Sequence, residues 1–326
     1  MRFAIVGCGL IGQKRARSLQ GRHALSVTSD VNIERAKLIA SRSPGARAVS
    51  DWKDAVRSAD VDCVIVATTN DYLAPVTLAA IEAGRPVIVE KPAARNVEEL
   101  APVMESAARS GVYVQVGFNH RYHPAFRKAR EIFESGVLGE MMFVRGRYGH
   151  GGRLGYEREW RADPKVAGGG ELLDQGVHLI DLARWFLGDF THVQGCACTF
   201  FWNMPVEDNG FLLLRTVKGQ AAWLHASCTE WKNLFSFEIY GRHGKLHIEG
   251  LGGSYGVERL TYYRMLPEMG PPETECWEYP GEDRSWDLEL QDFEKAAGGD
   301  RSCAPGLADA HAALATVEQI YRISES

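Results

Sequence analysis

Over the first 118 residues, short apolar runs alternate with longer segments of helical periodicity. Runs of this kind, bounded by glycine or polar residues, are typical of strands buried in a parallel sheet. The predicted strands are Arg2–Val6, Leu25–Thr28, Cys63–Ala67, Pro86–Val89 and Val112–Val116. Helices are predicted between them, ending at Leu19, Ser41, Ala83 and Ser110, the last one with a capping box of Asn96 and Glu99. The alternation predicts a doubly wound α/β domain over residues 1–119.

Beyond residue 119 the pattern changes to alternation with a period of two. Phe235, Phe237 and Ile239 alternate with polar residues, and Lys218-Gly219 separates two strand-like runs as in a hairpin. We therefore expect a large, mostly antiparallel sheet with helices on one face and an open second face, in an α+β domain over residues 120–304. Its predicted elements are a helix at Ala125–Glu134, strands at Glu140–Tyr148, Phe211–Val217, Gln220–Ser227 and Lys245–Glu249, and terminal helices at Ser285–Ala297 and Pro305–Ile323.

One predicted helix begins after three glycines, in the stretch Gly168–Asp181. Its apolar residues recur at helical spacing, and Asp174 and His178, four residues apart, are expected on the same face. In so apolar a helix, a carboxylate and an imidazole are costly unless they pair with each other or meet a ligand. Gly176 between them leaves room for a flat or bulky group. A buried Asp–His pair with only a structural role is the alternative.

Length and composition fit two globular domains. The chain has 326 residues, of which 45% are hydrophobic and 24% charged, so apolar residues suffice for sizeable cores. A net charge of −5 without a basic run argues against a nucleic-acid partner. No apolar stretch reaches membrane-spanning length, and Met1 leads straight into a strand, so we expect a cytoplasmic protein without a signal peptide. Seven scattered cysteines fit reduced thiols, and Cys196 and Cys198 match strand alternation better than zinc-ligand spacing.

A glycine motif, Gly7-Cys8-Gly9-Leu10-Ile11-Gly12, follows the first predicted strand. In a dinucleotide-binding turn the first glycine permits the tight turn and the second lets the backbone approach a pyrophosphate. The third allows close packing of helix on strand, and the helix N-terminus faces the phosphates. The motif alone is a weak signal, but its position at the first strand–helix junction is the context that supports cofactor binding.

Asp30 ends the second predicted strand, eighteen residues after Gly12. A carboxylate there accepts hydrogen bonds from the ribose hydroxyls and repels a 2′-phosphate, so NAD is favoured over NADP, although Arg35 follows nearby. A role for Asp30 as a helix N-cap is the alternative, and the two are compatible. Polar residues also lie where later strands end, at the edge where such a sheet binds its ligand: Thr68, Asn70, Glu90 and Lys91.

Residues 149–170 contain seven glycines, which predicts a long loop. The loop carries a cationic and aromatic set that suits an anionic or polyhydroxylated ligand such as a sugar nucleotide. A solvated charged loop is the alternative. The residues of this set are Arg153, Tyr156, Trp160, Arg161 and Lys165.

Five motifs occur in the order found in one protein family. They are the Gly7–Gly12 turn, Ala67-Thr68-Thr69-Asn70, Glu90-Lys91-Pro92, Val116-Gly117-Phe118-Asn119 and Asp174-x-x-x-His178. The chain resembles the Gfo/Idh/MocA oxidoreductases, the glucose–fructose oxidoreductase and inositol dehydrogenase family, by motif from residue 2 to about residue 190. It departs from the family pattern at Thr69 and Leu73, where many members carry Pro and His.

The resemblance implies an N-terminal NAD-binding Rossmann domain, with the last helix (305–323) packed near it and a cis peptide bond between Lys91 and Pro92. It also implies homodimers or homotetramers formed through the open sheet. A bare aromatic sheet face usually meets a second copy of the chain. The aromatic residues available for that face are Phe201, Trp202, Trp223 and Trp231. The predicted cofactor contacts are Gly7, Gly9, Leu10, Ile11, Gly12, Asp30, Thr68, Thr69, Asn70, Glu90, Lys91 and Asn119.

Hydride transfer from a secondary alcohol needs a nicotinamide, a base for the hydroxyl proton and a positive group near the developing oxyanion. Lys91 is suited to bind and polarise the oxygen, and His178 to take the proton while Asp174 holds its tautomer. The resemblance assigns these three residues to the catalytic set, and which of Lys91 and His178 is the base stays open. The predicted substrate contacts are Lys91, Arg121, Arg153, Trp160, Arg161, Asp174 and His178.

The leading hypothesis is an NAD-dependent dehydrogenase or reductase acting on a sugar, cyclitol or nucleotide-sugar derivative. A glycoside hydrolase that oxidises and re-reduces its substrate with bound NAD is the second, and relatives of that type resemble exported proteins with leader segments. A non-catalytic nucleotide or sugar sensor is the third, against which the intact Lys91, Asp174 and His178 argue. We expect no metal, because Asp174, His178 and Asp181 lack convincing further ligands.

Overall fold

The structure is a computed structural model that describes residues 1–268, 270–300 and 304–325. The chain divides into two compact units. The first consists of Met1–Phe118, Lys165–Gly168 and Trp286–Leu314, and the second of Asn119–Pro164, Gly169–Ser285 and Ala315–Ser326. The first unit thus takes up helical residues after position 285, which the sequence pattern assigns to the second domain. The domain boundaries expected from the sequence, 1–119 and 120–304, stay a prediction.

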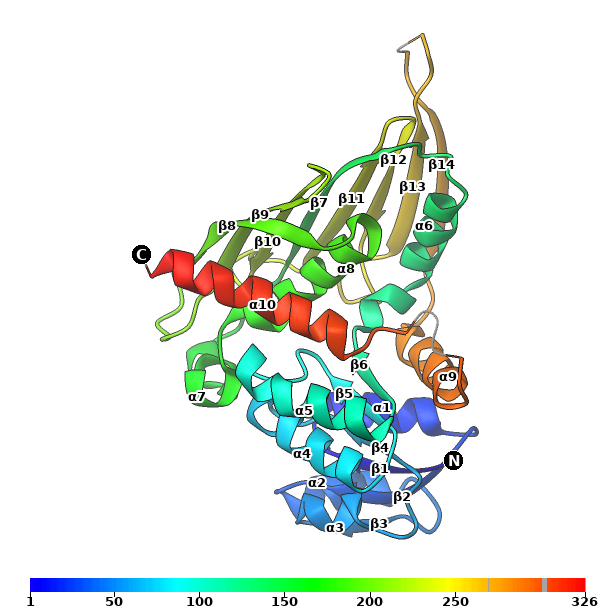
Figure 1. Cartoon of the computed structure of the whole chain (residues 1–326), viewed down its shortest axis with the longest axis vertical. Coiled ribbons are helices and arrows are strands. Elements are labelled where there is room, and N and C mark those ends of the chain that lie inside the picture. Colours follow the sequence, from blue (N-terminus) through cyan, green and yellow to red (C-terminus); the bar gives the residue numbers. More distant parts are fainter. Residues whose placement is uncertain (269, 301–303, 326) are drawn as a thin grey trace. The chain divides into compact units, whose positions relative to one another are not determined.

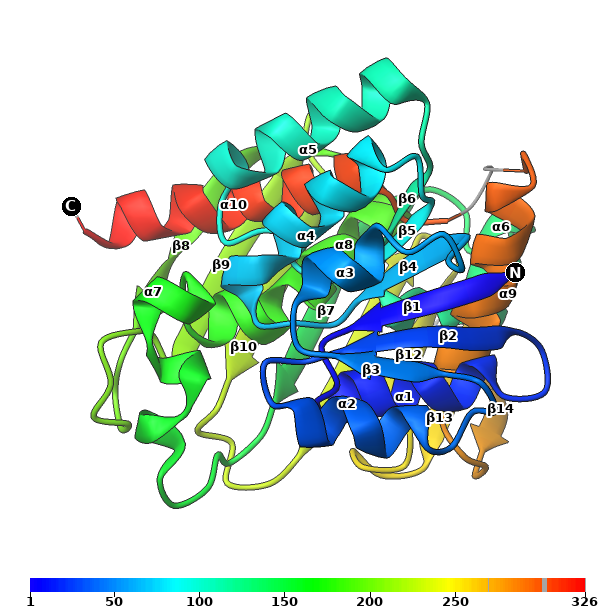
Figure 2. The same ribbon diagram turned by 90° about the horizontal axis from the view of Figure 1, so that it is seen from below.

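The first unit is built on a six-stranded parallel sheet in the order β3-β2-β1-β4-β5-β6 (Figure 2). The chain starts in the middle of the sheet and winds outward in both directions, which confirms the predicted doubly wound topology. The inner strands are apolar and buried, as strands covered on both faces must be. The strands are β1 (Arg2–Val6), β2 (Ala24–Ser29), β3 (Arg47–Val49), β4 (Cys63–Val66), β5 (Val87–Glu90) and β6 (Val114–Gly117).

Helices cover both faces of this sheet, with α1 and α2 on one side and α4 and α5 on the other (Figure 2). From α9, Leu290 and Phe293 join the apolar core around Phe3. Asn96 caps α5, because its side chain accepts a hydrogen bond from the N–H of Glu99 (2.8 Å). The predicted capping box is not completed, because the Glu99 carboxylate accepts the N–H of Arg95 instead of that of Asn96. The helices are α1 (Leu10–Leu19), α2 (Ile33–Ala40), α3 (Trp52–Val56), α4 (Asn70–Glu82), α5 (Val97–Ser110) and α9 (Ser285–Ala297).

The second unit is built on an eight-stranded sheet in the order β14-β13-β12-β11-β7-β10-β9-β8. Neighbouring strands are antiparallel except β7 and β10, which pair in parallel, so the predicted mostly antiparallel sheet is confirmed. Phe235, Phe237 and Ile239 of β11 are buried on one face, as their alternation predicts. The strands are β7 (Met141–Gly149), β8 (Phe190–Cys198), β9 (Asn209–Thr216), β10 (Ala221–Ser227), β11 (Leu234–Gly241), β12 (Gly244–Glu249), β13 (Glu258–Arg264) and β14 (Glu273–Tyr279).

Helices of the second unit cover one face of this sheet, and Figure 1 shows α8 lying across its strands. Phe126 of α6 packs against Phe235 and Phe237, with ring centroids 5.8 and 5.5 Å away. Helix α7 and the terminal α10 are each divided between the two units. The helices are η1 (Asn119–Tyr122), α6 (Pro124–Glu134), η2 (Tyr156–Arg158), η3 (Trp160–Ala162), α7 (Pro164–Ala167), η4 (Leu172–Gly176), α8 (Val177–Leu187) and α10 (Leu307–Ser324). Within the described residues, none of the helices is long and apolar enough to span a membrane.

Candidate active site

The glycine motif forms the turn between β1 and α1, and its three glycines differ in what surrounds them. Gly7 has a φ of +93°, and a Cβ there would lie 2.3 Å from the carbonyl oxygen of Ala67. A Cβ on Gly12 would lie 2.0 Å from the carbonyl oxygen of Gly7. At Gly9, by contrast, a Cβ would meet no heavy atom within 4 Å. Gly7 and Gly12 are therefore required by packing, and Gly9 borders open space.

Asp30 ties the end of β2 to this turn. Its carboxylate accepts hydrogen bonds from the backbone N–H groups of Cys8 and Asn32, both at 2.8 Å. The cap of α2 is Asn32, whose side chain accepts the N–H of Glu34, so the N-cap role considered for Asp30 is wrong. Each carboxylate oxygen of Asp30 accepts one of these bonds and keeps a lone pair that a ribose hydroxyl can use.

These residues fit a dinucleotide cofactor. Helix α1 begins at Leu10, and its N-cap residue is Gly9, which has no side chain to cap the helix. The first N–H groups of a helix lack intrahelical acceptors, and the positive end of the helix dipole favours a phosphate there. The backbone of Leu10 and Ile11 is thus suited to a pyrophosphate beside Gly9, and Asp30 to the adjoining ribose.

Thr68, Thr69 and Asn70 connect β4 to α4 beside the same turn. A Cβ on Gly7 would lie 2.7 Å from the backbone nitrogen of Thr68, so the two loops are in contact. The Thr69 hydroxyl donates to the carboxylate of Asp71 (2.6 Å), and the Asn70 amide donates to the carbonyl of Ala167 (2.8 Å). The side chains of Thr69 and Asn70 therefore already have partners within the first unit, and their contacts with cofactor stay predictions.

Strand β5 ends at Glu90, directly before Lys91, in a buried network of charges. Nε of Arg15 donates to Oε1 of Glu90 at 2.8 Å, and Nη1 of Arg15 lies 2.5 Å from Oε2 of Glu289. Burial raises the pKa of Glu289 to about 7, although the charge of Arg15 opposes this rise. The residue before Lys91 is thus anchored in the interior. The Lys91–Pro92 peptide bond is cis, as expected.

In the second unit, Asp174 lies in η4, a π-helical turn in place of the regular α-helix predicted. Such turns are wider than α-helical ones and frequently occur at functional sites. Nε of Arg161 donates to Oδ2 of Asp174 at 2.8 Å, and the guanidinium lies 4.6 Å from the ring of Trp160. The structure therefore brings together three of the residues predicted to bind substrate.

His178 lies in the first turn of α8 and is 4% exposed. Its ring stacks on that of His120 with centroids 3.7 Å apart. Tyr148 of β7 packs against both rings, at 5.2 Å from His120 and 6.2 Å from His178. Burial, and then the neighbouring Tyr255, raise the pKa of Tyr148 well above its ordinary value, so its hydroxyl stays protonated. A cluster of hydrogen-bonding rings thus surrounds the predicted proton acceptor.

Carboxylates and a further imidazole lie in the same part of the second unit. Nε2 of His150 is 3.6 Å from Oε2 of Glu171. Burial by itself would lower the pKa of His150, but Glu171 raises it above the usual value. Burial, followed by the charges of Glu171 and Asp174, raises the pKa of Tyr156. Proton acceptors, proton donors and hydrogen-bonding phenols are the groups that a polyhydroxylated ligand requires.

Three other predicted residues are bound to protein groups. Arg121 is buried, and its guanidinium contacts both carboxylate oxygens of Asp181, Nε at 2.8 Å. The Asn119 amide donates to the hydroxyl of Ser285 at 3.0 Å. Arg153, 69% exposed, pairs with Glu159 at 2.7 Å. Their predicted contacts with substrate or cofactor stay predictions.

Sequence reasoning missed five residues of the second-unit cluster. Their signals are weak, because each is a common residue type whose neighbours come from distant segments. His120 directly follows the Val116–Asn119 motif, and Tyr148 is a polar-tipped ring at a buried position of a strand. These two positions are the sequence signals that could have identified His120 and Tyr148. The missed residues are His120, Tyr148, His150, Glu171 and Tyr255.

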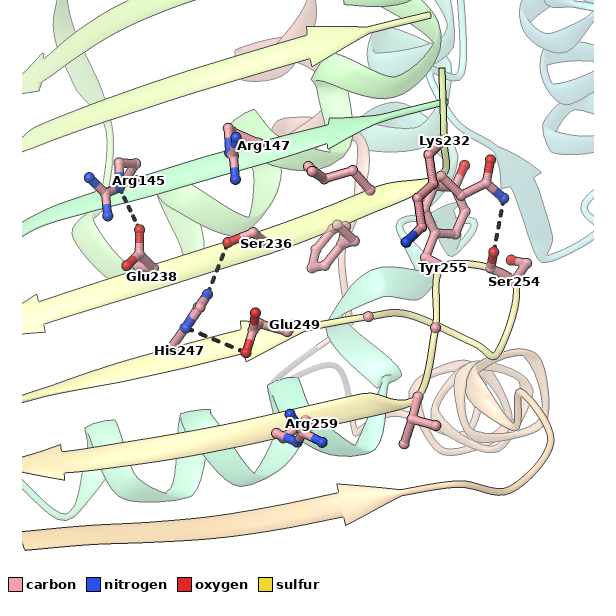
Figure 3. A pocket seen from close by; sticks show the side chains of 16 residues that line it. Arg145, Arg147, Lys232, Ser236, Glu238, His247, Glu249, Ser254, Tyr255 and Arg259 are labelled. Carbon is pink, nitrogen blue, oxygen red and sulfur yellow. Dashed lines mark hydrogen bonds and ion pairs between the residues drawn. The ribbon is translucent and has the colours of Figure 1, made fainter. Parts of the chain in front are cut away.

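A hollow of about 800 Å³ lies on the open face of the eight-stranded sheet, and its lining includes Tyr255 of the second-unit cluster (Figure 3). Its lining is charged: Arg145 contacts Glu238, and His247 lies 3.0 Å from the hydroxyl of Ser236. Trp223 is exposed on this face, whereas the other aromatic residues predicted there, Phe201, Trp202 and Trp231, come from loops. The open face is therefore more polar than the sequence suggests.

Two family models match this chain. Residues 1–118 match the model described as oxidoreductase family, NAD-binding Rossmann fold, and residues 126–247 match the Gfo/Idh/MocA C-terminal domain. The chain belongs to the Gfo/Idh/MocA oxidoreductase family. Residues 1–118 are accordingly an NAD-binding Rossmann domain, and the family and the cofactor expected from the sequence are both confirmed.

Several relatives are named sugar or cyclitol dehydrogenases. Levoglucosan dehydrogenase of Pseudarthrobacter phenanthrenivorans is 32% identical over 203 residues, which cover 59% of this chain and 50% of that protein. Inositol 2-dehydrogenase 2 of Saccharopolyspora erythraea is 32% identical over 228 residues, which cover 67% of this chain and 64% of the relative. The chain therefore matches between 50% and 64% of the length of these two relatives.

Solved structures share the fold over nearly the whole chain. Levoglucosan dehydrogenase in complex with NADH and L-sorbose has a TM-score of 0.87 at 24% identity, covering 99% of this chain and 97% of the other. The UDP-N-acetylglucosamine 3-dehydrogenase from Acidithiobacillus ferrooxidans has a TM-score of 0.84 at 20% identity, covering 100% and 98%. At these identities the likeness shows the fold.

Proposed function

We propose that this chain transfers hydride between a nicotinamide cofactor, NAD in preference to NADP, and a secondary alcohol or ketone of a sugar, cyclitol or nucleotide-sugar derivative. The observation that carries the proposal is the buried cluster in which His178 stacks on His120 beside Tyr148. A chain that joins an NAD-binding domain to such a proton-accepting group has the two functions that an alcohol dehydrogenase needs.

Each residue of the predicted catalytic set has a proposed role. Bound NAD supplies the ring that accepts or returns the hydride. The Lys91 ammonium binds the substrate oxygen and stabilises negative charge that develops on it. His178 accepts or returns the hydroxyl proton at an imidazole nitrogen, and Asp174, four residues before it, holds the tautomer of His178. Asp174 also accepts a hydrogen bond from Arg161. Lys91 remains the alternative base, and the pH profiles of the two variants distinguish these roles.

The proposed substrate class rests on the polar groups of the second unit and on the names of the relatives. A polyhydroxylated ligand needs several donors and acceptors near the reacting carbon, and the cluster offers imidazole, phenol, guanidinium and carboxylate groups. We propose Trp160, Arg161, Asp174 and His178 as substrate contacts. Arg121 and Arg153 already pair with carboxylates and are the weaker candidates.

The test follows nicotinamide absorbance while the purified protein meets NAD or NADP and a panel of sugars, cyclitols and nucleotide sugars. We expect turnover with NAD for at least one compound, and a loss of kcat of about 100-fold or more in Lys91→Ala and in His178→Ala. NADH binding, measured by fluorescence, should persist in His178→Ala. His192→Ala, at an exposed position of β8, is the matched control and should retain activity.

Two outcomes would replace the proposal. Cleavage of a glycoside without net change in NADH would identify a hydrolase with transient internal oxidation. Tight NADH binding without any turnover would identify a sensor. Because these outcomes differ in product and in cofactor balance, a single set of assays separates them from a dehydrogenase.

We also propose that the chain forms a homodimer or homotetramer through the open face of the eight-stranded sheet. Trp223 is 44% exposed on that face, and Phe143 stacks on Tyr240 there with ring centroids 4.2 Å apart. An uncovered sheet face with exposed aromatic rings is typical of a surface that meets a second copy.

A further inference from the structure

Glu207 lies just before β9 in the second unit, and it is buried. Its carboxylate accepts the backbone N–H of Gly170 at 2.9 Å through Oε2 and that of Leu172 at 3.0 Å through Oε1. Its backbone carbonyl accepts the N–H of Glu171, between them, at 3.0 Å. One residue thus bonds three consecutive N–H groups of a segment far away in the sequence.

These N–H groups open the helix that carries Asp174 and His178. The first N–H groups of a helix have no intrahelical acceptors, and the residue in the N-cap position, Glu171, makes no side-chain capping bond. Glu207 takes over this role from outside the helix. A carboxylate at a helix N-terminus is also favoured by the helix dipole.

Tyr321 of α10 completes the arrangement. Its hydroxyl donates to Oε1 of Glu207 at 2.8 Å. The backbone that carries Glu207 is held in turn by Asp208, which accepts three further backbone N–H groups at 2.7 to 3.0 Å, those of Phe200, Phe201 and Trp202. The position of the Glu207 carboxylate is therefore fixed from several directions.

The same contacts explain two of the three glycines that precede the helix. A Cβ on Gly169 would lie 2.0 Å from the hydroxyl oxygen of Tyr321, and a Cβ on Gly170 would lie 2.0 Å from the carbonyl oxygen of Glu207. Neither glycine has a positive φ, in contrast to Gly168 at +84°. The close approach of Glu207 and Tyr321, and not a special backbone conformation, requires glycine at positions 169 and 170.

We propose that Glu207 and Tyr321 are positioning residues for the reaction, and that their hydrogen bonds fix the start of the helix that carries Asp174 and His178. This proposal rests on the proposed function, because it assumes that Asp174 and His178 take part in the dehydrogenase reaction. Neither residue is assigned a contact with substrate. Both act through the backbone of Gly170–Leu172.

The protonation state of Glu207 links its hydrogen bonds to the pH profile of the reaction, which a purely structural contact would leave unchanged. Burial raises the pKa of Glu207, and hydrogen bonds from Tyr321, Gly170 and Leu172 oppose the rise. Tyr321 and Cys228 interact with it, and burial raises the pKa of each, so both stay neutral. The carboxylates of Glu171 and Asp208 act on Cys228 as well. Loss of the Tyr321 hydroxyl removes one bond that favours the carboxylate, so Glu207 would keep its proton to higher pH.

The decisive variant is Tyr321→Phe, and its control is Tyr113→Phe. The control removes one tyrosine hydrogen bond away from this helix, because the Tyr113 hydroxyl donates to the side chain of Gln115 at 2.9 Å. We expect Tyr321→Phe to lose about tenfold in kcat near neutral pH, with the KM for NAD unchanged and activity recovering at alkaline pH. Glu207→Gln should lose kcat without alkaline recovery. Wild-type kcat and an unshifted pH profile in Tyr321→Phe would overturn the proposal.

Amide hydrogen exchange supplies a readout that is independent of turnover. Peptides covering residues 170–178 should exchange about tenfold faster or more in Tyr321→Phe and Glu207→Gln than in wild type or Tyr113→Phe. Unchanged exchange would overturn the proposal, as would faster exchange with wild-type kinetics, since the contact would then be structural only. Failure of the proposed function would appear differently, as a wild-type protein without turnover but with the expected exchange differences.

Discussion

Glu289 is expected to make the stability of the first unit depend on pH. Its side chain is fully buried, and burial raises its pKa to about 7, with Arg15 lowering it and Glu90 raising it further. The pKa in the unfolded chain is near 4.5. Because the folded form binds more protons between these two values, the free energy of unfolding falls as pH rises through this window. The contribution is fully present below about pH 4.5 and is lost by about pH 7.

The size of the effect follows from the shift. A difference of this size between folded and unfolded pKa corresponds to about 3 kcal/mol. Glu289→Gln keeps the shape of the side chain and removes its titration. Relative to wild type, the variant should therefore gain about 3 kcal/mol between about pH 5 and about pH 8. In calorimetric melting curves this corresponds to a relative rise in Tm on the order of 5–10 °C.

Glu105→Gln is the control for this experiment. Glu105 belongs to the same unit and lies on α5, where its side chain is exposed. We expect no comparable change with pH in this variant. A Tm difference between Glu289→Gln and wild type that is the same at both pH values would refute the reasoning, because an ionised Glu289 would then cost the fold nothing.

The cofactor turn and the open sheet face lead to three further predictions. Gly9→Ala, with a Cβ in open space, should keep its Tm but bind NADH at least about tenfold more weakly by fluorescence, whereas Gly12→Ala should lower the Tm because its Cβ would lie 2.0 Å from Gly7. Asp30→Ala should weaken NADH binding by about 10- to 100-fold in calorimetry and reduce the preference over NADPH, and an unchanged preference would contradict the role of this carboxylate. Trp223→Asp should yield monomers in light scattering, and a mass equal to that of wild type would argue against association through this face.

The parallel sheet could be predicted because its inner strands are buried on both faces and appear as continuous apolar runs. Strand β3 and the short helix α3 were missed, since β3 is an edge strand of three residues, none of which is fully buried. Strand β14 was missed for the same reason, because its residues are mostly exposed and show no alternation in burial. Edge strands take their register from a neighbour, and that neighbour is not visible in the local sequence.

The glycine turn could also be predicted, because its spacing and its position between a strand and a helix are visible in the local sequence, although the contact of Gly7 with Ala67 is not. The buried network around Arg15 could not. An arginine in an amphipathic helix looks solvent-exposed, and only the fold brings it to Glu90 and Glu289. Gly117 belongs to a motif noted for its resemblance alone, yet a Cβ there would lie 2.9 Å from Nη2 of Arg15. The stacking of His120 on His178 is hidden in the same way.

The central claim is that this chain moves a hydride between nicotinamide and a carbon of a polyhydroxylated substrate. The most direct measurement supplies NADH in which both hydrogens at C4 of the nicotinamide are deuterium, together with keto-sugars and keto-cyclitols, and analyses the products by mass spectrometry. The account predicts an alcohol that carries one deuterium, an equal amount of NAD, and neither product with Lys91→Ala. An absence of deuterium from every product, or a glycoside cleaved while the cofactor stays unchanged, would contradict it.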